Sequence, residues 1–520
     1  MSLGRRPCVD VGRLGGLEAH PHIFRWLGCA LLALSWAVSA VADESEWFKP
    51  LGDAEKASRR RVSSGEPPPL PLPATPVKRT ERKRPPAAPT LIRKVVWGET
   101  APYTFDTGES TEIADWNLCP ADLQQLLLKA GTALGQRYGS DSVPLASFEG
   151  DPETTPVLFF SGSRSIRFDP TQLELIRGYV LRGGMVIADN VAGSPYFYGS
   201  FAKAMGEAFP ESPLRVVPLD HPVFHLIEDA TRAGYPKNVE GERPLLEAVY
   251  VGCRLGVGLS RYGLGCGWDD REVPLIEKAA YYDVASANRI GVNLVAYAIG
   301  YSHVAREEAK PELFGALDEQ RPTDELVFAQ LRHGGHWNVH PGGAASLLRF
   351  TRQNTSIRTS LKRVPVTAGK DDLSGFTLLY LTGLDRFELD EAAAAALKAF
   401  LEGEGTLIIN NGLGLATFDA AVRAELKKVL PDAALEPLPP DHPAFKAVFN
   451  VARVKYNSAL PGVTEPRLEG IAVGGDLRVI YSPFDLEAGW QGCEHPMAKA
   501  YAPESAMQLG VNLIMYALTH

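Results

Sequence analysis

Residues 157–190, VLFFSGSRSIRFDPTQLELIRGYVLRGGMVIADN, carry the pattern that decides the fold. The stretch opens with a short apolar run ended by Gly162, which is typical of a strand buried on both faces. A helix start follows, because Asp169 can accept hydrogen bonds from first-turn amides and Gln172 completes a capping box around Pro170. After Gly184 the segment MVIADN predicts a second buried strand. A strand, a helix and a parallel strand within about 35 residues form a right-handed crossover, so we predict a doubly wound α/β sheet.

The same pattern returns at residues 378–411, LLYLTGLDRFELDEAAAAALKAFLEGEGTLIINN, 221 positions later. Other stretches repeat at or near this offset: DWNLCP (115–120) with HWNVHP (336–341), PLDHPVF (218–224) with PPDHPAF (439–445), and GVNLVAYAIGY (from 291) with GVNLIMYALTH (from 510). Repeats of about 200 residues are whole domains. We therefore predict two tandem α/β domains, copy 1 (residues 91–302) and copy 2 (residues 324–520), joined by a linker (residues 303–323), each with a mostly parallel sheet between helices.

Length and charge narrow the function. A chain of 520 residues exceeds what one core usually organises, which agrees with two domains. The formal net charge of -9 argues against nucleic-acid binding, which requires clustered Lys and Arg on the folded surface.

The first 90 residues predict export. Residues 26–42, WLGCALLALSWAVSAVA, form an apolar run that ends in a small-x-small cleavage pattern, so residues 1–42 are expected to be a signal peptide, with an uncleaved membrane anchor as the alternative. Residues 43–90 are rich in proline and basic side chains and are expected to be a disordered tether, or else a basic arm for an anionic surface. The rest of the chain should be soluble in the periplasm or outside the cell.

The cysteines of the exported chain are Cys119, Cys253, Cys266 and Cys493. None has a cysteine at the matching position of the other copy, so a repeated disulfide or metal site is not expected, although one pair such as Cys253 with Cys266 stays open. His333, His336 and His340 are close in sequence, but the glycine pair between the first two predicts a loop. We expect no metal and no other cofactor.

Polar and aromatic residues recur where strands are predicted to end. In open parallel sheets, ligands gather beyond the carboxyl ends of the strands, so these residues could form a polar crevice with tryptophan walls, suited to a sugar or peptide. The alternative is that they end strands and fill the core. The candidate binding residues are Trp116, Asp189, Asn190, Trp268 and Asp269 in copy 1, and Trp337, Asn410, Asn411, Asp485 and Trp490 in copy 2.

The repeated Asp-His-Pro stretch has two interpretations. As catalytic residues, Asp220 with His221 and Asp441 with His442 could form dyads that move a proton. As architecture, each Asp would cap a short helix whose first turn accommodates the proline. We favour architecture, because adjacent side chains seldom face each other and no nucleophile elbow accompanies them.

The ordered set of motifs resembles a bacterial family, domain of unknown function 4159. The set comprises VFAQLRHGGHWNVHP, LLRFTRQNTSI, FELDEAAAAALKAFLEGEGTLIINN, PPDHPAF, a Gly-Trp loop and GVNLIMYALTH, and copy 1 matches it more loosely. Members commonly carry an Asp-Leu-Gly-Asp-Gly-Trp-Glu type loop, of which copy 1 keeps Leu264 and Trp268, and copy 2 keeps Asp485 and Trp490. The resemblance implies the class I glutamine amidotransferase-like superfamily and a flavodoxin-like sheet. It implies no known reaction.

We therefore predict an exported, non-catalytic tandem module that binds a glycan, a peptide or an envelope protein. Neither copy contains the Gly-x-Cys-x-Gly elbow that amidotransferases need, and no complete metal set is apparent. The alternative is a hydrolase of carbohydrate or amide bonds that uses Asp and His residues at the strand ends.

Overall fold

A computed structural model describes residues 88–104, 110–270, 278–309, 312–319, 322 and 324–520. The predicted signal peptide (1–42) and nearly all of the predicted tether (43–90) lie outside these residues. In the part of the chain that is described, no helix is both long and apolar enough to cross a membrane.

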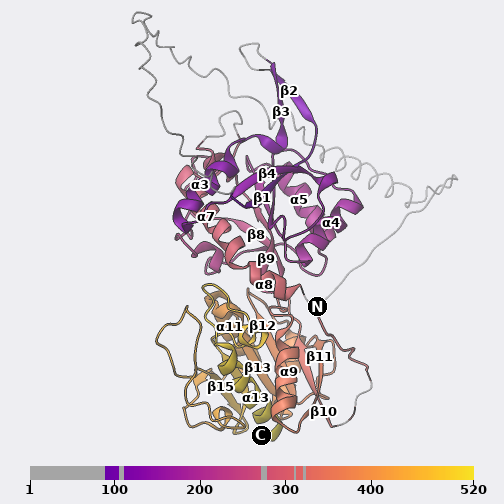
Figure 1. Ribbon diagram of the computed structural model, residues 1–520. Helices are drawn as coiled ribbons and strands as arrows, with labels where there is room; N and C mark the ends of the chain where they lie inside the picture. The colour runs from indigo at the N-terminus through magenta and orange to yellow at the C-terminus, as the bar shows by residue number, and fades with distance from the viewer. Residues whose placement is uncertain (1–87, 105–109, 271–277, 310–311, 320–321, 323) are drawn as a thin grey trace, which may run out of the picture. The chain divides into compact units, whose positions relative to one another are not determined.

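In copy 1, helices α3 and α7 lie on one side of the sheet strands and α4 and α5 on the other (Figure 1). The sheet has seven strands in the order β4-β1-β5-β6-β9-β8-β7. The first five strands in this order are parallel, and β8 and β7 add an antiparallel edge. Its strands are β1 (Thr90–Val96), β4 (Gly139–Pro144), β5 (Val157–Gly162), β6 (Met185–Asn190), β7 (Arg215–Val216), β8 (Leu246–Val251) and β9 (Arg254–Ser260). Its α-helices are α3 (Asp122–Leu134), α4 (Pro170–Leu181), α5 (Pro195–Ala208), α6 (Gly265–Trp268), α7 (Val284–Gly300) and α8 (Ser302–Glu308).

Copy 2 repeats this topology in a seven-stranded sheet ordered β11-β10-β12-β13-β16-β15-β14. Its strands are β10 (Glu325–Leu331), β11 (Arg358–Val366), β12 (Leu378–Gly383), β13 (Thr406–Asn411), β14 (Glu436–Pro437), β15 (Glu469–Val473) and β16 (Asp476–Ser482). Its α-helices are α9 (Gly343–Asn354), α10 (Glu391–Glu402), α11 (Ala416–Val429), α12 (Glu487–Gln491) and α13 (Pro503–Thr519). The prediction of two tandem α/β domains with mostly parallel sheets is confirmed.

The crossover unit forms where the sequence predicts it. All six residues of β5 and all six of β6 are buried, because helices cover both faces of the sheet. Asp169 caps α4 and Gln172 completes the capping box. Asp390 caps α10 at the matching position of copy 2.

A repeated glycine allows an aromatic ring to close each crossover. A Cβ at Gly184 would lie 2.3 Å from the Tyr179 ring, and a Cβ at Gly405 would lie 2.3 Å from the Phe400 ring. Both rings are buried against the start of the next strand. The glycines therefore recur because any side chain there would displace an aromatic ring from the core.

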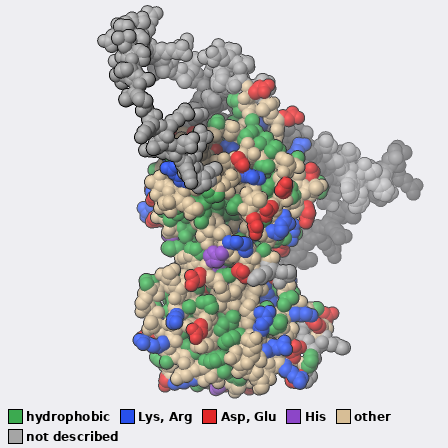
Figure 2. All heavy atoms as spheres, in the orientation of Figure 1, with side chains coloured by type: hydrophobic (Ala, Val, Ile, Leu, Met, Phe, Trp, Pro, Cys, Tyr) green, Lys and Arg blue, Asp and Glu red, His purple; other side chains and the backbone are tan. Residues whose placement is uncertain are grey.

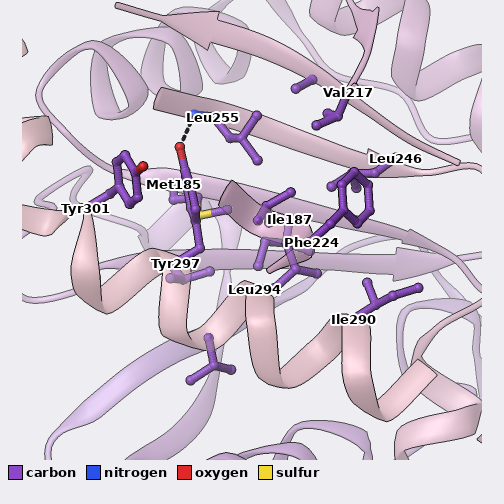
Figure 3. Close-up of a cluster of buried hydrophobic side chains, with 14 of the residues drawn as sticks. Met185, Ile187, Val217, Phe224, Leu246, Leu255, Ile290, Leu294, Tyr297 and Tyr301 are labelled. Carbon is purple, nitrogen blue, oxygen red and sulfur yellow. Dashed lines mark hydrogen bonds between the residues drawn. The ribbon is translucent and has the colours of Figure 1, made fainter. Parts of the chain in front are cut away.

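The cores lie between the sheets and their helices. In copy 1, Ile290, Leu294 and Tyr297 of α7 face Ile187 and Leu255 of the sheet (Figure 3). The Tyr297 hydroxyl accepts a hydrogen bond of 3.0 Å from the Leu255 amide, which satisfies a polar atom inside an apolar cluster.

Two features differ from the sequence-based expectation. Helix α8 occupies the beginning of the predicted linker (303–323), and its residue Glu308 is buried and accepts a hydrogen bond from the Cys253 amide. A β-hairpin, β2 (Thr100–Thr104) with β3 (Ser110–Ala114), follows β1 in copy 1. The sequence repeat does not predict this hairpin, because the described residues of copy 2 contain no counterpart.

Candidate functional site

In copy 1, Asp189 lies fully buried at the carboxyl end of β6 and holds the start of α6. Its carboxylate accepts hydrogen bonds from the Leu264 amide (2.7 Å) and the Gly265 amide (2.9 Å). Burial raises the pKa of Asp189 to about 7, although these two hydrogen bonds favour the ionised form. Asp189 is therefore an internal anchor for a helix start.

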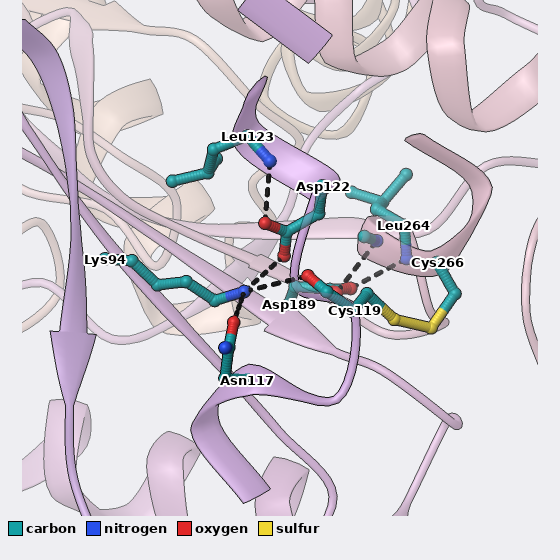
Figure 4. The surroundings of a disulfide bond; sticks show 9 residues. Lys94, Asn117, Cys119, Asp122, Leu123, Asp189, Leu264 and Cys266 are labelled. Atoms are coloured by element: carbon teal, nitrogen blue, oxygen red, sulfur yellow. Dashed lines mark hydrogen bonds and ion pairs between the residues drawn. A yellow bond between two sulfur atoms is a disulfide. The ribbon is translucent and has the colours of Figure 1, made fainter. Parts of the chain in front are cut away.

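A buried ion pair lies beside this anchor (Figure 4). The Lys94 ammonium, at the end of β1, contacts a carboxylate oxygen of Asp122 at 2.6 Å and also donates to Asn117 Oδ1 and the Cys119 carbonyl, both at 3.1 Å. Burial raises the pKa of Asp122, while Lys94 opposes that shift. With three acceptors, the ammonium is well satisfied inside the protein.

A disulfide closes copy 1 at the same place. Cys119 is bonded to Cys266, with their Cα atoms 5.2 Å apart (Figure 4). The pairing left open from the sequence, Cys253 with Cys266, is thus wrong, because the loop after β9 brings Cys266 against the segment that precedes α3. Cys253 and Cys493 are buried and outside any disulfide.

Copy 2 replaces these groups with a different polar network. Asn410 stands where copy 1 has Asp189, and its Oδ1 accepts from the Leu486 amide at 2.7 Å. Its Nδ2 donates to Asp485 at 3.0 Å, and Asp485 also accepts from His340 Nε2 at 2.7 Å. Burial alone would raise the pKa of Asp485, but His340 and the hydrogen bonds to this carboxylate hold the pKa below its ordinary value. Burial alone would lower the pKa of His340, but the charge of Asp485, its hydrogen bond to the ring and the nearby Glu487 and Glu308 together raise that pKa.

In both copies a buried carboxylate fills the same space between two helices, but the carboxylate comes from a different helix in each copy. A Cβ added at Gly265 of copy 1 would lie 3.3 Å from an Asp122 carboxylate oxygen. In copy 2 the position of Gly265 is Glu487 and the position of Asp122 is Gly343, where an added Cβ would lie 2.6 Å from Glu487 Cγ. The acidic residue lies on the helix after the first strand in copy 1 (α3) and at the start of the short helix after the last parallel strand in copy 2 (α12).

The Asp122 carboxylate has an ionic partner in direct contact, Lys94, whereas the Glu487 carboxylate has none among the described residues. Among the described residues, neither carboxylate oxygen of Glu487 has a hydrogen-bond partner, and burial raises its pKa to about 7. The Tyr380 hydroxyl lowers that pKa slightly, but its geometry falls outside that of a hydrogen bond. The equivalent of Lys94 is Gln330, which binds Arg363 at 2.6 Å, and Arg363 contacts Asn338 and Glu312 instead.

The predicted tryptophan walls divide into two pairs. Trp268 and Trp490 are buried in the core, where their indole nitrogens donate to the carbonyls of Ala287 (2.7 Å) and Ala506 (2.9 Å). They do not line a crevice, because each packs beneath the last long helix of its copy. Trp116 and Trp337 are partly exposed.

Trp337 lines a pocket of about 350 Å³. Its polar lining includes Arg215, Glu312, His333 and Asn338. The Arg332 guanidinium lies 5.2 Å from the Trp337 ring centre, at cation–π distance. A second cavity, of about 830 Å³, lies near the amino ends of the strands in copy 1, away from the strand-end residues predicted from the sequence.

The remaining predicted binding residues serve the backbone. Asn190 Nδ2 donates to the Arg261 carbonyl at 3.0 Å, and Asn411 both accepts from and donates to the main chain of Leu415. Asp269 is the residue that follows α6. Asp189, Asn410 and Asp485 are fully buried, so the strand ends are filled by protein groups rather than by an open polar crevice.

The Asp-His-Pro stretches are architectural, but the capping residue is the histidine. His221 Nδ1 accepts from the Val223 amide and His442 Nδ1 accepts from the Ala444 amide, at the starts of two short 3-10 helices. Asp220 instead binds the Thr417 amide (2.8 Å) and hydroxyl (2.7 Å) of copy 2. The expected Asp caps are therefore corrected, and within the described residues no hydrogen bond joins Asp220 to His221.

The three neighbouring histidines of copy 2 do not converge on one another. His333 Nε2 contacts the Thr382 carbonyl and His336 Nε2 contacts the Gly252 carbonyl. His340 instead lies beside His495, with ring centres 4.9 Å apart, and His495 Nδ1 lies 3.2 Å from Cys253 Sγ. The sequence analysis did not identify this group, because Cys253 and His495 are 242 residues apart and neither residue type is repeated at the matching position of the other copy.

The two repeated sheets and their strand-end loops identify the chain as a tandem α/β protein. The chain belongs to the family described as domain of unknown function DUF4159, whose model matches residues 109–299 and 327–518. The second match covers nearly the whole sheet of copy 2, whereas the first begins after β1 and covers the remaining strands of the copy 1 sheet. No curated protein matches the chain.

Proposed function

We propose that the chain is an exported, non-catalytic binding module whose ligand, a glycan or peptide fragment, occupies the pocket beside Trp337. The observation that carries this proposal is the pocket itself, about 350 Å³ with an aromatic wall and polar side chains of both charge signs. Pockets of this size that combine an aromatic surface with a few placed polar groups are typical of small-ligand sites.

The lining favours a neutral or zwitterionic polar ligand. The Trp337 face suits the apolar side of a sugar ring or a planar peptide group. Arg215 can donate to a carboxylate or hydroxyl, and Glu312 can accept from an amine or hydroxyl. Acidic and basic side chains lie interspersed on the described surface seen in Figure 2, which supports a ligand other than nucleic acid.

We also propose a finer classification and location. The sheet topology and the DUF4159 match are compatible with the class I glutamine amidotransferase-like superfamily. The apolar run and cleavage pattern in residues 26–42 support export from a bacterial cell to the periplasm or beyond. A hydrolase that uses Asp220 with His221 has no support from the geometry, because Asp220 binds Thr417 and His221 is buried.

A binding screen tests this proposal. The purified chain is offered to an array of glycans and short peptides, and hits are measured by titration calorimetry. A Trp337→Ala variant should weaken binding of any genuine pocket ligand by at least about 10-fold, since a buried aromatic contact contributes more than about 1.4 kcal/mol.

Trp116→Ala is the matched control, because Trp116 is the equivalent residue of copy 1 and is also partly exposed. It should bind as the wild type does. Equal loss in both variants, or ligands that bind with full affinity to Trp337→Ala, would refute the pocket as the binding site.

A further inference from the structure

Three side chains from distant parts of the chain meet in the interior: Cys253 at the turn between β8 and β9, His340 before α9, and His495 after α12. One nitrogen or sulfur atom of each lies within 4.8 Å of the others, and all three residues are buried. Cys253 is fully buried, His340 is fully buried, and His495 is 2% exposed. A thiol and two imidazoles at this spacing form the kind of donor set that binds zinc.

The distance between two of the three ligand atoms already suits tetrahedral coordination. Cys253 Sγ and His495 Nδ1 are 3.2 Å apart. Sulfur and nitrogen ligands around one tetrahedral zinc ion are separated by about 3.5 Å, given typical zinc–ligand bond lengths. Cys253 and His495 would therefore need to adjust by only a few tenths of an ångström, while the His340 nitrogen, which lies within 4.8 Å of both atoms, would move closer by up to about 1.3 Å.

The orientation of His340 also indicates a metal ligand. Its Nε2 is held by Asp485 at 2.7 Å, while its Nδ1 is buried and, within the described residues, has no hydrogen-bond partner. Metal-binding histidines commonly present one ring nitrogen to the ion and donate the other N–H to a carboxylate. Asp485 is itself fixed by Asn410 and by the amides of Leu413 and Ala488, so it can orient the ring firmly.

At the position that matches His340, copy 1 has a disulfide-bonded cysteine. The residue equivalent to His340 is Cys119, which forms the disulfide with Cys266, and the equivalent of Cys266 in copy 2 is Ala488. Copy 2 therefore lacks the cross-link that fixes this segment in copy 1. A bound ion would supply a comparable restraint.

We propose that Cys253, His340 and His495 form a zinc site, with Asp485 as the residue that positions His340. The site is separate from the Trp337 pocket and does not depend on the function proposed for that pocket. Thiolate and imidazole ligands select zinc over magnesium or calcium, which prefer oxygen. With three protein ligands, a fourth position is left for water or another ligand.

Cobalt substitution tests the site directly. The full chain is stripped of metal with a chelator under reducing conditions and titrated with Co²⁺, then with Zn²⁺. We expect one Co²⁺ per chain, a thiolate-to-cobalt charge-transfer band in the near ultraviolet, its loss when Zn²⁺ displaces the cobalt, and a higher melting temperature with Zn²⁺.

Variants assign the ligands. Cys253→Ser should abolish the charge-transfer band and lower Zn²⁺ affinity by more than about 100-fold, and Asp485→Asn should lower it by about 10- to 100-fold. His303→Asn is the matched control, because His303 is exposed and contacts the Glu494 carbonyl near the same segment. It should keep both the band and the affinity.

If Cys253→Ser does not fold, His495→Gln provides the second ligand test, with loss of one nitrogen donor and a retained but altered band. The proposal is overturned if the reduced wild-type chain shows no thiolate–cobalt band, or if the band persists in Cys253→Ser. A Cys253–Cys493 disulfide in the chain as isolated, detected by mass spectrometry, would overturn it as well.

Discussion

At the level of single residues, Asp189 and Asn410 perform one structural task with different chemistry. Each lies at the end of its central strand and accepts a hydrogen bond from the amide of the following loop leucine, Leu264 or Leu486. Asp189 also buries a carboxyl group whose pKa is raised to about 7. Because the unfolded chain would titrate near pH 4, Asp189 links the stability of copy 1 to pH.

We predict that Asp189→Asn reduces this pH dependence. Between about pH 4 and pH 7 the folded state holds a proton that the unfolded state has released, so this contribution to stability falls as pH rises and stays lost above pH 7. Between pH 4 and pH 8, the free energy of unfolding of Asp189→Asn should rise by on the order of 3 kcal/mol relative to that of the wild type. Urea unfolding at several pH values measures it, and a constant difference would contradict the assignment.

The asparagine should be tolerated, because Ser161 Oγ is buried without a hydrogen-bond partner in the described structure. In copy 2 the matching Asn410 Nδ2 donates to Thr382 Oγ1 at 3.2 Å. A new amide at position 189 can use Ser161 in the same way.

We predict that Asp220→Ala destabilises the chain while Asp441→Ala does not. Asp220 accepts hydrogen bonds from the Thr417 amide and hydroxyl at the start of α11, whereas the equivalent Asp441 is exposed. Loss of this helix cap should cost about 1–2 kcal/mol in the free energy of unfolding. Chemical denaturation of both variants checks this, and equal effects would show that Asp220 has no special role.

At the level of elements, the acidic side chain is on the helix after the first strand in copy 1 and on the short helix after the last parallel strand in copy 2. Copy 1 combines Asp122 with Gly265, and copy 2 combines Gly343 with Glu487. Each glycine makes room for the acidic residue of the opposite element. The two elements are therefore coupled, and a change in one should depend on the other.

We predict that Gly343→Ala costs about 1–3 kcal/mol, because its Cβ would lie 2.6 Å from Glu487 Cγ. The cost should be smaller in a Glu487→Ala background, where the crowded atom is absent. Gly206→Ala in α5 is the control: its Cβ would meet nothing within 4 Å, so the change should be neutral or slightly stabilising. Thermal unfolding of the wild type, Gly343→Ala, Glu487→Ala and the double variant gives the coupling energy. Strictly additive effects of the two substitutions would contradict the coupling.

Elements were predictable from sequence where local chemistry alone decides them. The runs before Gly162 and Gly383 and the caps at Asp169 and Asp390 depend on neighbours in the chain, so they could be located. For Trp268 the sequence left open a crevice wall or a core position, because its sequence neighbours do not reveal the helix that covers it; it lies in the core. The partner of Asp220, Thr417, is 197 residues away in the sequence. The second repeat does not indicate this contact, because the equivalent Asp441 is exposed.

At the level of the molecule, copy 1 carries a cross-link between distant parts of its chain. The Cys119–Cys266 disulfide spans 147 residues. In the chain-entropy account, a long closed loop restricts the unfolded state and stabilises the folded one. Copy 2 has no such bond within its described residues.

We predict that Cys119→Ser with Cys266→Ser lowers the stability of copy 1 by about 3–5 kcal/mol. Denaturant unfolding should show a lower midpoint for the double variant than for the wild-type chain. Reductant should shift the wild-type chain in the same direction and leave the double variant unaffected. A wild-type transition insensitive to complete reduction would contradict this prediction.

The position of the bond also sets an order of events during biogenesis. Cys119 cannot pair with Cys266 until every strand of the first sheet has been synthesised, because β9, the last of them, ends at Ser260. Formation of this disulfide is therefore a late step that follows assembly of the parallel strands. Earlier pairing of Cys119 with another thiol would trap the nascent chain in a misfolded form.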